Sequence, residues 1–383
     1  MSDWFNIERV HRGDNDFTLL ILMVLILGVG MTTLFSASYY YGGKRFDDPF
    51  YFFNRQLMFV SAGGVLALIV SRLPMDFIRR RLPLLLSVSL LLMIATFIPG
   101  IKQSIMGANR WIIVAGISFQ PSELVKLTLI LYLSAILSKK ADKLDDVINS
   151  IIPPLLIVIV FTALIYLQND FSTAFFVIML SLLLFFVAGI KIRYFAFLFT
   201  MVIPLAAMLI FTKEHRVRRL IAFIDPNSDP IGTGYQVIAA KDAIAAGSFW
   251  GRGFGMGLEK LGGLPEAHSD FIFAVFAEEL GFIGVLFMVV LFVAFALKGY
   301  SLALSYAGDR RFEFLLTFGL TSCLVFQAFI NMAVVAGMLP ATGLPLPFFS
   351  HGGSSMVVTM IMAGLLLNLS RKGADYETGR TYE

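Results

Sequence analysis

The sequence has few cysteines, which cross-link small secreted domains, and few charged residues, which keep a protein in solution. Its single cysteine, Cys323, lies in an apolar run, which excludes a disulfide framework and a cysteine-based metal site. Asp, Glu, Lys and Arg make up only 15% of the 383 residues, too few for the surface of a soluble protein of this length. The formal net charge of +4 is too small to indicate nucleic-acid binding.

Apolar residues are abundant instead. They make up 58% of the chain, with 38 Phe and 17 Met, and the mean hydropathy is +0.81. Ten apolar segments are long enough, some with their flanking residues, to cross a hydrocarbon core of about 30 Å. The first is too long for a signal peptide, so we expect it to be retained. We predict an all-α, polytopic membrane helix bundle with spans at 17–39, 52–70, 82–99, 122–138, 151–168, 171–189, 194–212, 280–297, 314–339 and 352–369.

The bundle is predicted to be one domain over residues 17–370. It follows an N-terminal segment at 1–16 and precedes a polar tail at 371–383 that we expect to be disordered. One connection, residues 213–279 before the eighth span, is long. Seventeen Lys and Arg residues flank the spans on the side of the two termini, against four in the short loops of the other side. Because Lys and Arg concentrate on the cytoplasmic side, both termini should be cytoplasmic and the long loop extracytoplasmic.

The unusual polar residues then fall on the outer face, where they can form one site. Glu123 and Lys126 are three residues apart and share one helix face. A charged pair at the end of an apolar helix is either a structural ion pair or part of a site, and both interpretations stay open. Asp170 follows a tight turn, where we favour a capping role for the next helix.

The long loop carries most of the candidate ligands. Arg216, Arg218 and Arg219 could hold an anionic ligand, although for the cluster alone we favour phospholipid headgroups. Arg252 lies among the alternating glycines of segment 251–257. These glycines do not form a dinucleotide-binding fingerprint, because no strand precedes them, and they more readily mark sharp turns or close backbone approach.

Asp270 stands where the long loop meets an apolar helix, with His268 two residues before it. Partial desolvation there would raise the pKa of the carboxyl group and make it a better general base, whereas the alternative is a helix N-cap. Segment 339–355 holds three prolines and three glycines, which forbid a regular helix, so it either lines a cavity or forms a long turn. The histidines and aspartates lack ligand spacing, so we expect no metal held by the protein.

As a set, these motifs resemble the SEDS (shape, elongation, division, sporulation) family over nearly the whole chain. The matching motifs are Asn-Arg-Trp, Phe-Gln-Pro-Ser-Glu-x-x-Lys, Asp-Pro with Gly-x-Gly-Tyr-Gln, Leu-Pro-Glu-Ala-His-Ser-Asp and Thr-Gly-Leu-Pro-Leu-Pro-Phe. Within the family, Glu266-Ala267-His268 and Thr342-Gly343-Leu344-Pro345 look more like the FtsW division branch than the RodA elongation branch. Two segments depart from the family pattern: Asn169 stands where proline is usual, and His351 where tyrosine is usual.

The resemblance implies a peptidoglycan polymerase of the cytoplasmic (inner) membrane. Such enzymes extend glycan strands from lipid II on the outer face, surrounded by membrane lipids. They work beside a class B penicillin-binding transpeptidase and other division proteins, and nucleic acid has no part in the reaction. No cofactor is expected to be tightly bound, although a divalent cation, Mg²⁺ or Mn²⁺, could accompany the substrate pyrophosphate without a cage of protein ligands.

Asp270 matches the family's essential loop aspartate, so we predict it to be the catalytic base. The predicted substrate-binding residues are Glu123, Lys126, Arg216, Arg218, Arg219, Arg252, His268, Asp170 and Ser354. The alternatives are a lipid II flippase and a non-catalytic division scaffold. Transport would require polar groups between both faces, whereas here they gather on the outer side, and a scaffold would make Asp270 dispensable.

Overall fold

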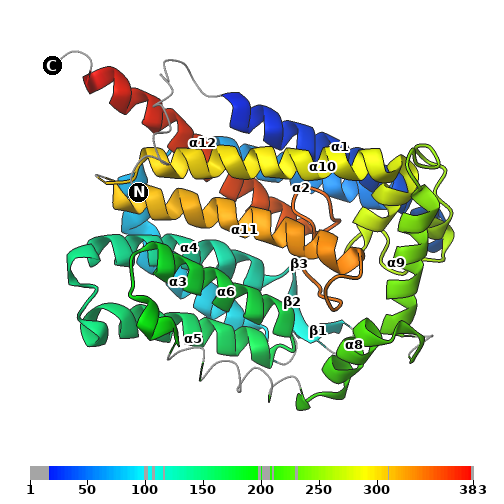
Figure 1. Cartoon of the computed structure of the whole chain (residues 1–383), viewed down its shortest axis with the longest axis horizontal. Helices are drawn as coiled ribbons and strands as arrows, with labels where there is room; N and C mark the ends of the chain where they lie inside the picture. Colours follow the sequence, from blue (N-terminus) through cyan, green and yellow to red (C-terminus); the bar gives the residue numbers. More distant parts are fainter. Residues whose placement is uncertain are drawn as a thin grey trace, which may run out of the picture.

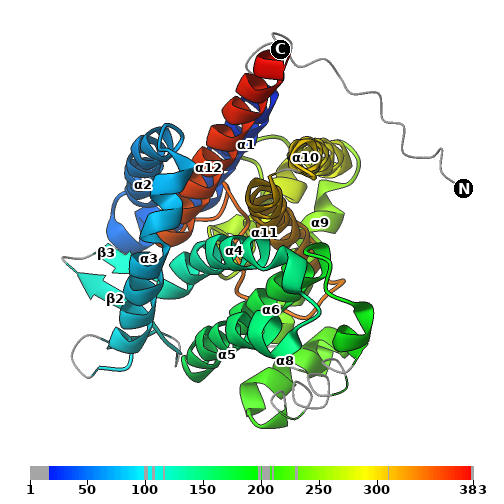
Figure 2. The same ribbon diagram turned by 90° about the vertical axis from the view of Figure 1, so that its left-hand side faces the viewer.

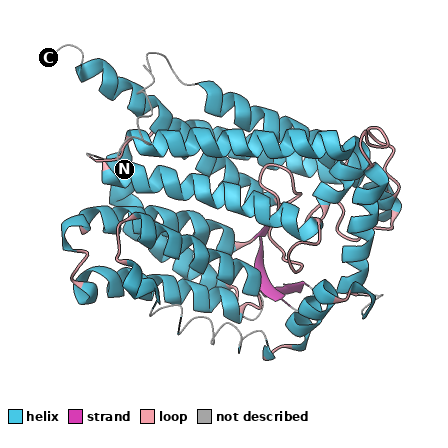
Figure 3. Ribbon diagram, viewed as in Figure 1, coloured by secondary structure: helices cyan, strands magenta, loops and turns pink. Residues whose placement is uncertain are grey.

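The structure is a computed structural model that describes residues 17–98, 102–105, 108–114, 117–196, 200, 208, 211–228, 232–308 and 310–380. Helices form nearly all of this part of the chain, and a small sheet lies toward one end of the bundle (Figures 1 and 3). The all-helical, polytopic architecture predicted from the sequence is confirmed.

Nine of the ten predicted spans correspond to a helix in the described residues. Their bounds are α1 (Phe17–Phe46), α2 (Tyr51–Val70), α3 (Met75–Ala95), α4 (Pro121–Lys139), α5 (Ile152–Leu167), α6 (Phe171–Val187), α10 (Ile272–Ser305), α11 (Arg311–Val335) and α12 (Gly353–Arg380). Two short turns, η1 (Ala141–Lys143) and η2 (Val147–Ile151), precede α5. The predicted span at 194–212 lies mostly outside the described residues.

Seven segments of the described chain are long and apolar enough to cross a membrane. The helix α6 is apolar but has only 17 residues. The helix α3 carries three consecutive arginines, Arg79 to Arg81, in its second turn, which lowers its mean hydropathy. Length and composition alone therefore support seven of the nine predicted spans that have a helix in the described residues.

The long segment 213–279 contains regular structure of its own. It contains α8 (Glu214–Ile224), η3 (Pro226–Ser228), α9 (Thr233–Gly247) and η4 (Glu259–Leu261). It also contains the first turns of α10, which begins at Ile272 because residues 272–277 are themselves apolar and buried. Gly281, with φ of 64°, then breaks the helix. Our predicted span at 280–297 assumed one uninterrupted helix and therefore placed the start of α10 too late.

Two other segments differ from expectation. The tail that we predicted to be disordered is helical as far as Arg380, since no proline interrupts α12. The loop at 100–121 contains three antiparallel strands in the order β1 (Lys102–Ile105), β2 (Ala108–Val114) and β3 (Ile117–Phe119). The β-branched and aromatic residues of β2 suit a strand.

Small residues and apolar side chains hold the helices together. The helices α4 and α11 lie in the middle of the bundle (Figure 2), and 72% of the apolar stretch of each is buried. The helix α12 packs closely along α2, where a Cβ on Gly364 would lie 2.5 Å from the Ala67 carbonyl oxygen. Outer helices expose large apolar side chains such as Leu91 and Leu68, as a lipid-facing surface requires.

Candidate active site

The segments that carry the predicted site residues meet at one end of the bundle. The strands, α8, α9 and the irregular segment 340–351 lie together there, at the opposite end from the C-terminus of α12 (Figure 1). Contacts between them confirm the meeting: Arg110 of β2 pairs with Asp170 at 3.4 Å, and Arg219 of α8 donates to the Ala341 carbonyl oxygen at 3.5 Å.

Asp270 lies directly before α10, but it does not cap that helix. Phe271 occupies the N-cap position. The Asp270 carbonyl oxygen accepts a hydrogen bond of 3.0 Å from the Asn331 amide of α11, and the same amide donates to the Leu344 carbonyl oxygen at 2.9 Å. One buried side chain thus ties the residue before α10 to the irregular segment.

Two further hydrogen bonds join the same segments. The Ser350 hydroxyl donates to the Ser269 carbonyl oxygen at 2.7 Å, and the His351 backbone N–H donates to the His268 carbonyl oxygen at 3.0 Å. The prolines and glycines of segment 340–351 prevent a regular helix, so its backbone groups lack helical hydrogen-bond partners. These two hydrogen bonds pair part of this segment with residues 268 and 269 instead. The result is a fixed backbone on both sides of the Asp270 carboxylate.

Two cations face this carboxylate. A Cβ placed on Gly343 would lie 3.7 Å from Asp270 Oδ2 and 3.6 Å from Arg110 Nη1, so these two side chains flank the same glycine. Burial lowers the pKa of the Arg219 guanidinium, and the nearby charge of Arg110 lowers it further, while Asp270 and Asp170 oppose this. Two arginines close enough to repel each other form a site that suits a multiply charged anion.

The environment of Asp270 sets its acidity. Burial, followed by the charge of Glu266, raises the pKa of the Asp270 carboxyl group to about 6, although Arg110 and Arg219 act in the opposite direction. A carboxylate with this pKa is largely ionised at neutral pH and still more basic than an exposed aspartate. This combination is what a general base requires.

Glu123 and Lys126 form a buried ion pair of 2.8 Å on α4. The Lys126 ammonium also donates to the Gln327 side-chain oxygen of α11 at 2.7 Å, and the Gln327 amide donates to the Pro345 carbonyl oxygen at 2.8 Å. The pair therefore supports segment 340–351 through Gln327. Its contacts fit the structural interpretation that the sequence left open.

The three arginines of α8 have different surroundings. Only Arg219 faces Asp270. Arg216 is buried, donates to the Tyr166 hydroxyl at 2.9 Å and lies over the Tyr166 ring. Arg218 forms an exposed ion pair of 2.6 Å with Glu214.

Three other predicted site residues, Asp170, Ser354 and His268, contact the elements next to them. Asp170 caps α6, as we favoured, by accepting the Thr173 N–H at 3.2 Å. The Ser354 hydroxyl accepts the Gln120 N–H at 2.8 Å. His268 stacks on the Tyr41 ring, and burial lowers the pKa of its imidazole, so it is mainly neutral and a weak partner for a phosphate.

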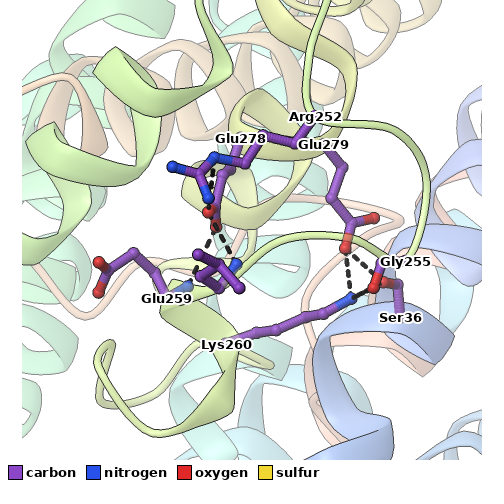
Figure 4. A network of polar contacts seen from close by, with 8 residues as sticks. Ser36, Arg252, Gly255, Glu259, Lys260, Glu278 and Glu279 are labelled. Atoms are coloured by element: carbon purple, nitrogen blue, oxygen red, sulfur yellow. Dashed lines mark hydrogen bonds and ion pairs between the residues drawn. The ribbon is translucent and has the colours of Figure 1, made fainter.

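Arg252 contacts a different set of residues. Its Nε lies 3.7 Å from Glu278 Oε1 (Figure 4), and the structure records no contact between it and the residues around Asp270 in the part of the chain that it describes. Among those same residues, no group of three or more His, Cys, Asp or Glu side chains could hold a metal ion.

Several residues that build the site were missed by sequence reasoning. Gln327 and Asn331 sit four residues apart in an apolar helix, and polar side chains at such positions are a signal that could have identified them. Arg110 was noted within a motif but was not nominated as a ligand. Its position opposite Asp270 depends on the small sheet, which no pattern in the sequence predicted.

The chain is similar throughout to known proteins. Residues 17–374 match the family described as "Cell cycle protein" (FTSW_RODA_SPOVE). A relative from Borreliella burgdorferi named "Probable peptidoglycan glycosyltransferase FtsW" is 38% identical over 352 residues, which cover 92% of this chain and 95% of that protein. A Legionella pneumophila protein of the same name is 38% identical and covers 91% of this chain and 88% of its own length.

Solved structures share the fold. A chain from a study of structural coordination of polymerization and crosslinking by a peptidoglycan synthase complex is 26% identical, with a TM-score of 0.76 over 94% of this chain and 98% of that chain. The rod shape determining protein RodA of Thermus thermophilus is 27% identical, with a TM-score of 0.68 over 94% of this chain and 97% of its own.

Proposed function

The chain belongs to the FtsW/RodA/SpoVE family of cell cycle proteins, and we propose that it polymerises lipid II into peptidoglycan strands during cell division. Its relatives are named as peptidoglycan glycosyltransferases of the FtsW type, and their similarity extends over nearly the whole chain. The observation that carries the mechanism is that Asp270 Oδ2 and Arg110 Nη1 both lie within 4 Å of the position that a Cβ on Gly343 would take.

The reaction forms one bond and breaks one. The hydroxyl oxygen of the acceptor sugar bonds to the anomeric carbon of the donor, while the bond from that carbon to the pyrophosphate oxygen breaks. Asp270 takes the hydroxyl proton, and the electron pair of the broken bond leaves with the pyrophosphate. Arg110 and Arg219 lie where they can stabilise that leaving group. Mg²⁺ or Mn²⁺ could add charge if the pyrophosphate itself provides most of its ligands.

The membrane and the partner complete the proposal. The isoprenoid chains would lie along the apolar helix faces, in the outer leaflet of the cytoplasmic membrane. The excess of Lys and Arg at the other end of the bundle supports cytoplasmic termini. The structural match to a chain of a peptidoglycan synthase complex supports a class B penicillin-binding transpeptidase as partner. The function is tested with purified protein and lipid II: glycan chains are expected, and unchanged lipid II would overturn the proposal.

The rate should depend on pH through Asp270. Only the ionised carboxylate can act as a base, and its pKa is about 6. We therefore expect kcat/KM to be low below pH of about 5 and to rise to a plateau above about 7. Initial rates of lipid II polymerisation across this range measure the effect, and a flat profile would exclude Asp270 as the base.

Removing the cation opposite Asp270 should also reduce the rate. Substituting Arg110→Met keeps an unbranched side chain but loses the charge, and we expect kcat to fall by about 100-fold because the pyrophosphate loses a preorganised donor. Arg80→Met, on the exposed start of α3 at the other end of the bundle, is the matched control. Equal rates for the two variants would contradict a role for Arg110 in the reaction.

A further inference from the structure

A second cluster of buried charges lies on the loop that leads from α9 to Asp270. It joins α1, the loop residues 251–261 and the first turns of α10 (Figure 4). Lys260, Glu278 and Glu279 are all buried, with 7%, 1% and 2% of their surfaces exposed. Buried charges destabilise a protein unless each is paired, so such a cluster requires a physical account.

Lys260 is the centre of one half of the cluster. Its ammonium pairs with Glu279 Oε1 at 2.5 Å and donates to the Ser36 hydroxyl at 2.6 Å and to the Gly255 carbonyl oxygen at 2.8 Å. The Ser36 hydroxyl in turn donates to Glu279 Oε1 at 2.6 Å. Lys260 thus makes three interactions, which join the loop to α1 and to α10.

Glu278 holds the other half. Its two carboxylate oxygens accept the backbone N–H groups of Leu258 at 2.8 Å and Glu259 at 3.3 Å. The Arg252 guanidinium approaches the same carboxylate, and the Arg252 backbone N–H donates to the Glu278 carbonyl oxygen at 3.0 Å. The two consecutive glutamates therefore bind the loop at both its beginning and its end.

The glycines of the loop permit this close attachment. Gly251 has φ of 80°, and a Cβ there would lie 2.2 Å from the Glu279 carbonyl oxygen. A Cβ on Gly257 would lie 2.9 Å from Glu278 Oε2. Larger residues at these two positions would push the loop away from α10, whereas Gly253 and Gly255 have φ of 101° and 82°, which favour glycine for conformational reasons.

The cluster and the catalytic carboxylate lie at opposite ends of one short helical segment. The first part of α10, from Ile272 to the break at Gly281, is buried, and Asp270 precedes it by two residues. The contacts that hold Glu278 and Glu279 in place therefore also hold this helical segment, and with it the position of Asp270. No substrate contact is needed for this effect, because the coupling runs through the helix.

From these contacts we propose that Lys260 is a positioning residue for Asp270. Together with Glu279 and Ser36 it holds the start of α10 against α1, so that the carboxylate stays aligned with Arg110. This inference rests on the polymerase function proposed above. It assigns no new chemistry to Lys260, which lies on the far side of the helical segment from the reaction.

The substitution Lys260→Met tests this, since it keeps the length of the side chain and removes the charge. Loss of alignment should reduce kcat for lipid II polymerisation by about 10- to 100-fold, while KM changes less than about two-fold. Amide hydrogen exchange of residues 268–272 should become faster in the same variant. Lys191→Met is the control: it removes an exposed ion pair with Asp145 after the far end of α6 and should change neither quantity.

A second variant separates positioning from mere stability. Lys260→Met leaves Glu279 as an unpaired buried charge, whereas Lys260→Met combined with Glu279→Leu leaves an apolar pair. We expect the double variant to recover at least about ten-fold of the lost kcat and to restore slow exchange at residues 268–272. If Lys260→Met fails to fold, Ser36→Ala tests the same link, with the ion pair intact and a smaller loss of kcat expected.

Wild-type kcat in Lys260→Met, or a lower kcat without faster exchange at residues 268–272, would overturn the proposal. If the wild-type protein itself fails to polymerise lipid II, the function proposed above is wrong. The exchange measurement still reads the effect of Lys260 on the Asp270 segment in that case. The two failures are therefore distinguishable.

Discussion

Asparagine in place of Asp270 is expected to lower kcat for lipid II polymerisation by about 10²- to 10⁴-fold. The substitution preserves the size of the side chain and removes only its capacity to take a proton. The backbone oxygen that Asn331 holds is unaffected, so the fold should be retained. Initial rates with purified protein and fluorescent lipid II measure the loss, and thermal unfolding in detergent checks the fold.

This prediction separates catalysis from binding. A base acts in the transition state, so kcat should fall while KM stays near its wild-type value. The residual activity of Asp270→Asn should also lose the rise in rate through pH of about 6 that the wild type is expected to show. Near wild-type rates in this variant would contradict the assignment of Asp270 as the base.

Removing the charge of Lys126 is expected to have the largest effect on stability. In Lys126→Met the buried Glu123, 3% exposed, loses its cation, and Gln327 loses a hydrogen-bond donor. Breaking a buried pair from one side destabilises a protein by about 3–5 kcal/mol. Thermal unfolding in detergent should therefore occur at a clearly lower temperature than for wild type, whereas the exposed Lys191→Met control should differ by less than about 0.5 kcal/mol.

A companion variant decides what the pair does. Lys126→Met combined with Glu123→Leu removes both charges, and most of the lost stability should return. If the pair serves only to keep its two charges compensated, polymerisation should return as well. Restored stability without restored activity would mean that the pair also acts on the substrate, and unchanged stability in Lys126→Met would contradict the buried ion pair.

The bundle could be predicted because bilayer physics acts on local composition. Apolar runs identify helices, and an asymmetric distribution of Lys and Arg indicates which ends share a side. The same reasoning placed Asp170, Asp270 and segment 339–355 on one face, where the structure does bring them together. The spacing of Glu123 and Lys126 likewise predicted that both lie on one helix face, where the structure pairs them.

What could not be predicted depends on tertiary contacts. The break at Gly281 allows residues 272–280 to form a separate helical segment, and the sequence alone does not distinguish this from a late helix start. The sequence gives no reason to distinguish Arg219 from Arg216 and Arg218. The direction in which α8 packs places Arg219 near Asp270 and gives the other two different partners. Lys260 carries no motif, because one partner, Ser36, is far away along the chain and the other, Glu279, lies 19 residues further on in a different element.

The central claim is that this bundle does chemistry at its outer end instead of moving lipid II through its interior. Proteoliposomes that contain the purified protein, its transpeptidase partner and fluorescent lipid II test it most directly, with product length and lipid sidedness read from the same sample. We expect glycan chains to accumulate with the wild-type protein and to be nearly absent with Asp270→Asn. Lipid II that crosses the bilayer without polymerising, or glycan chains that form equally in both samples, would contradict the claim.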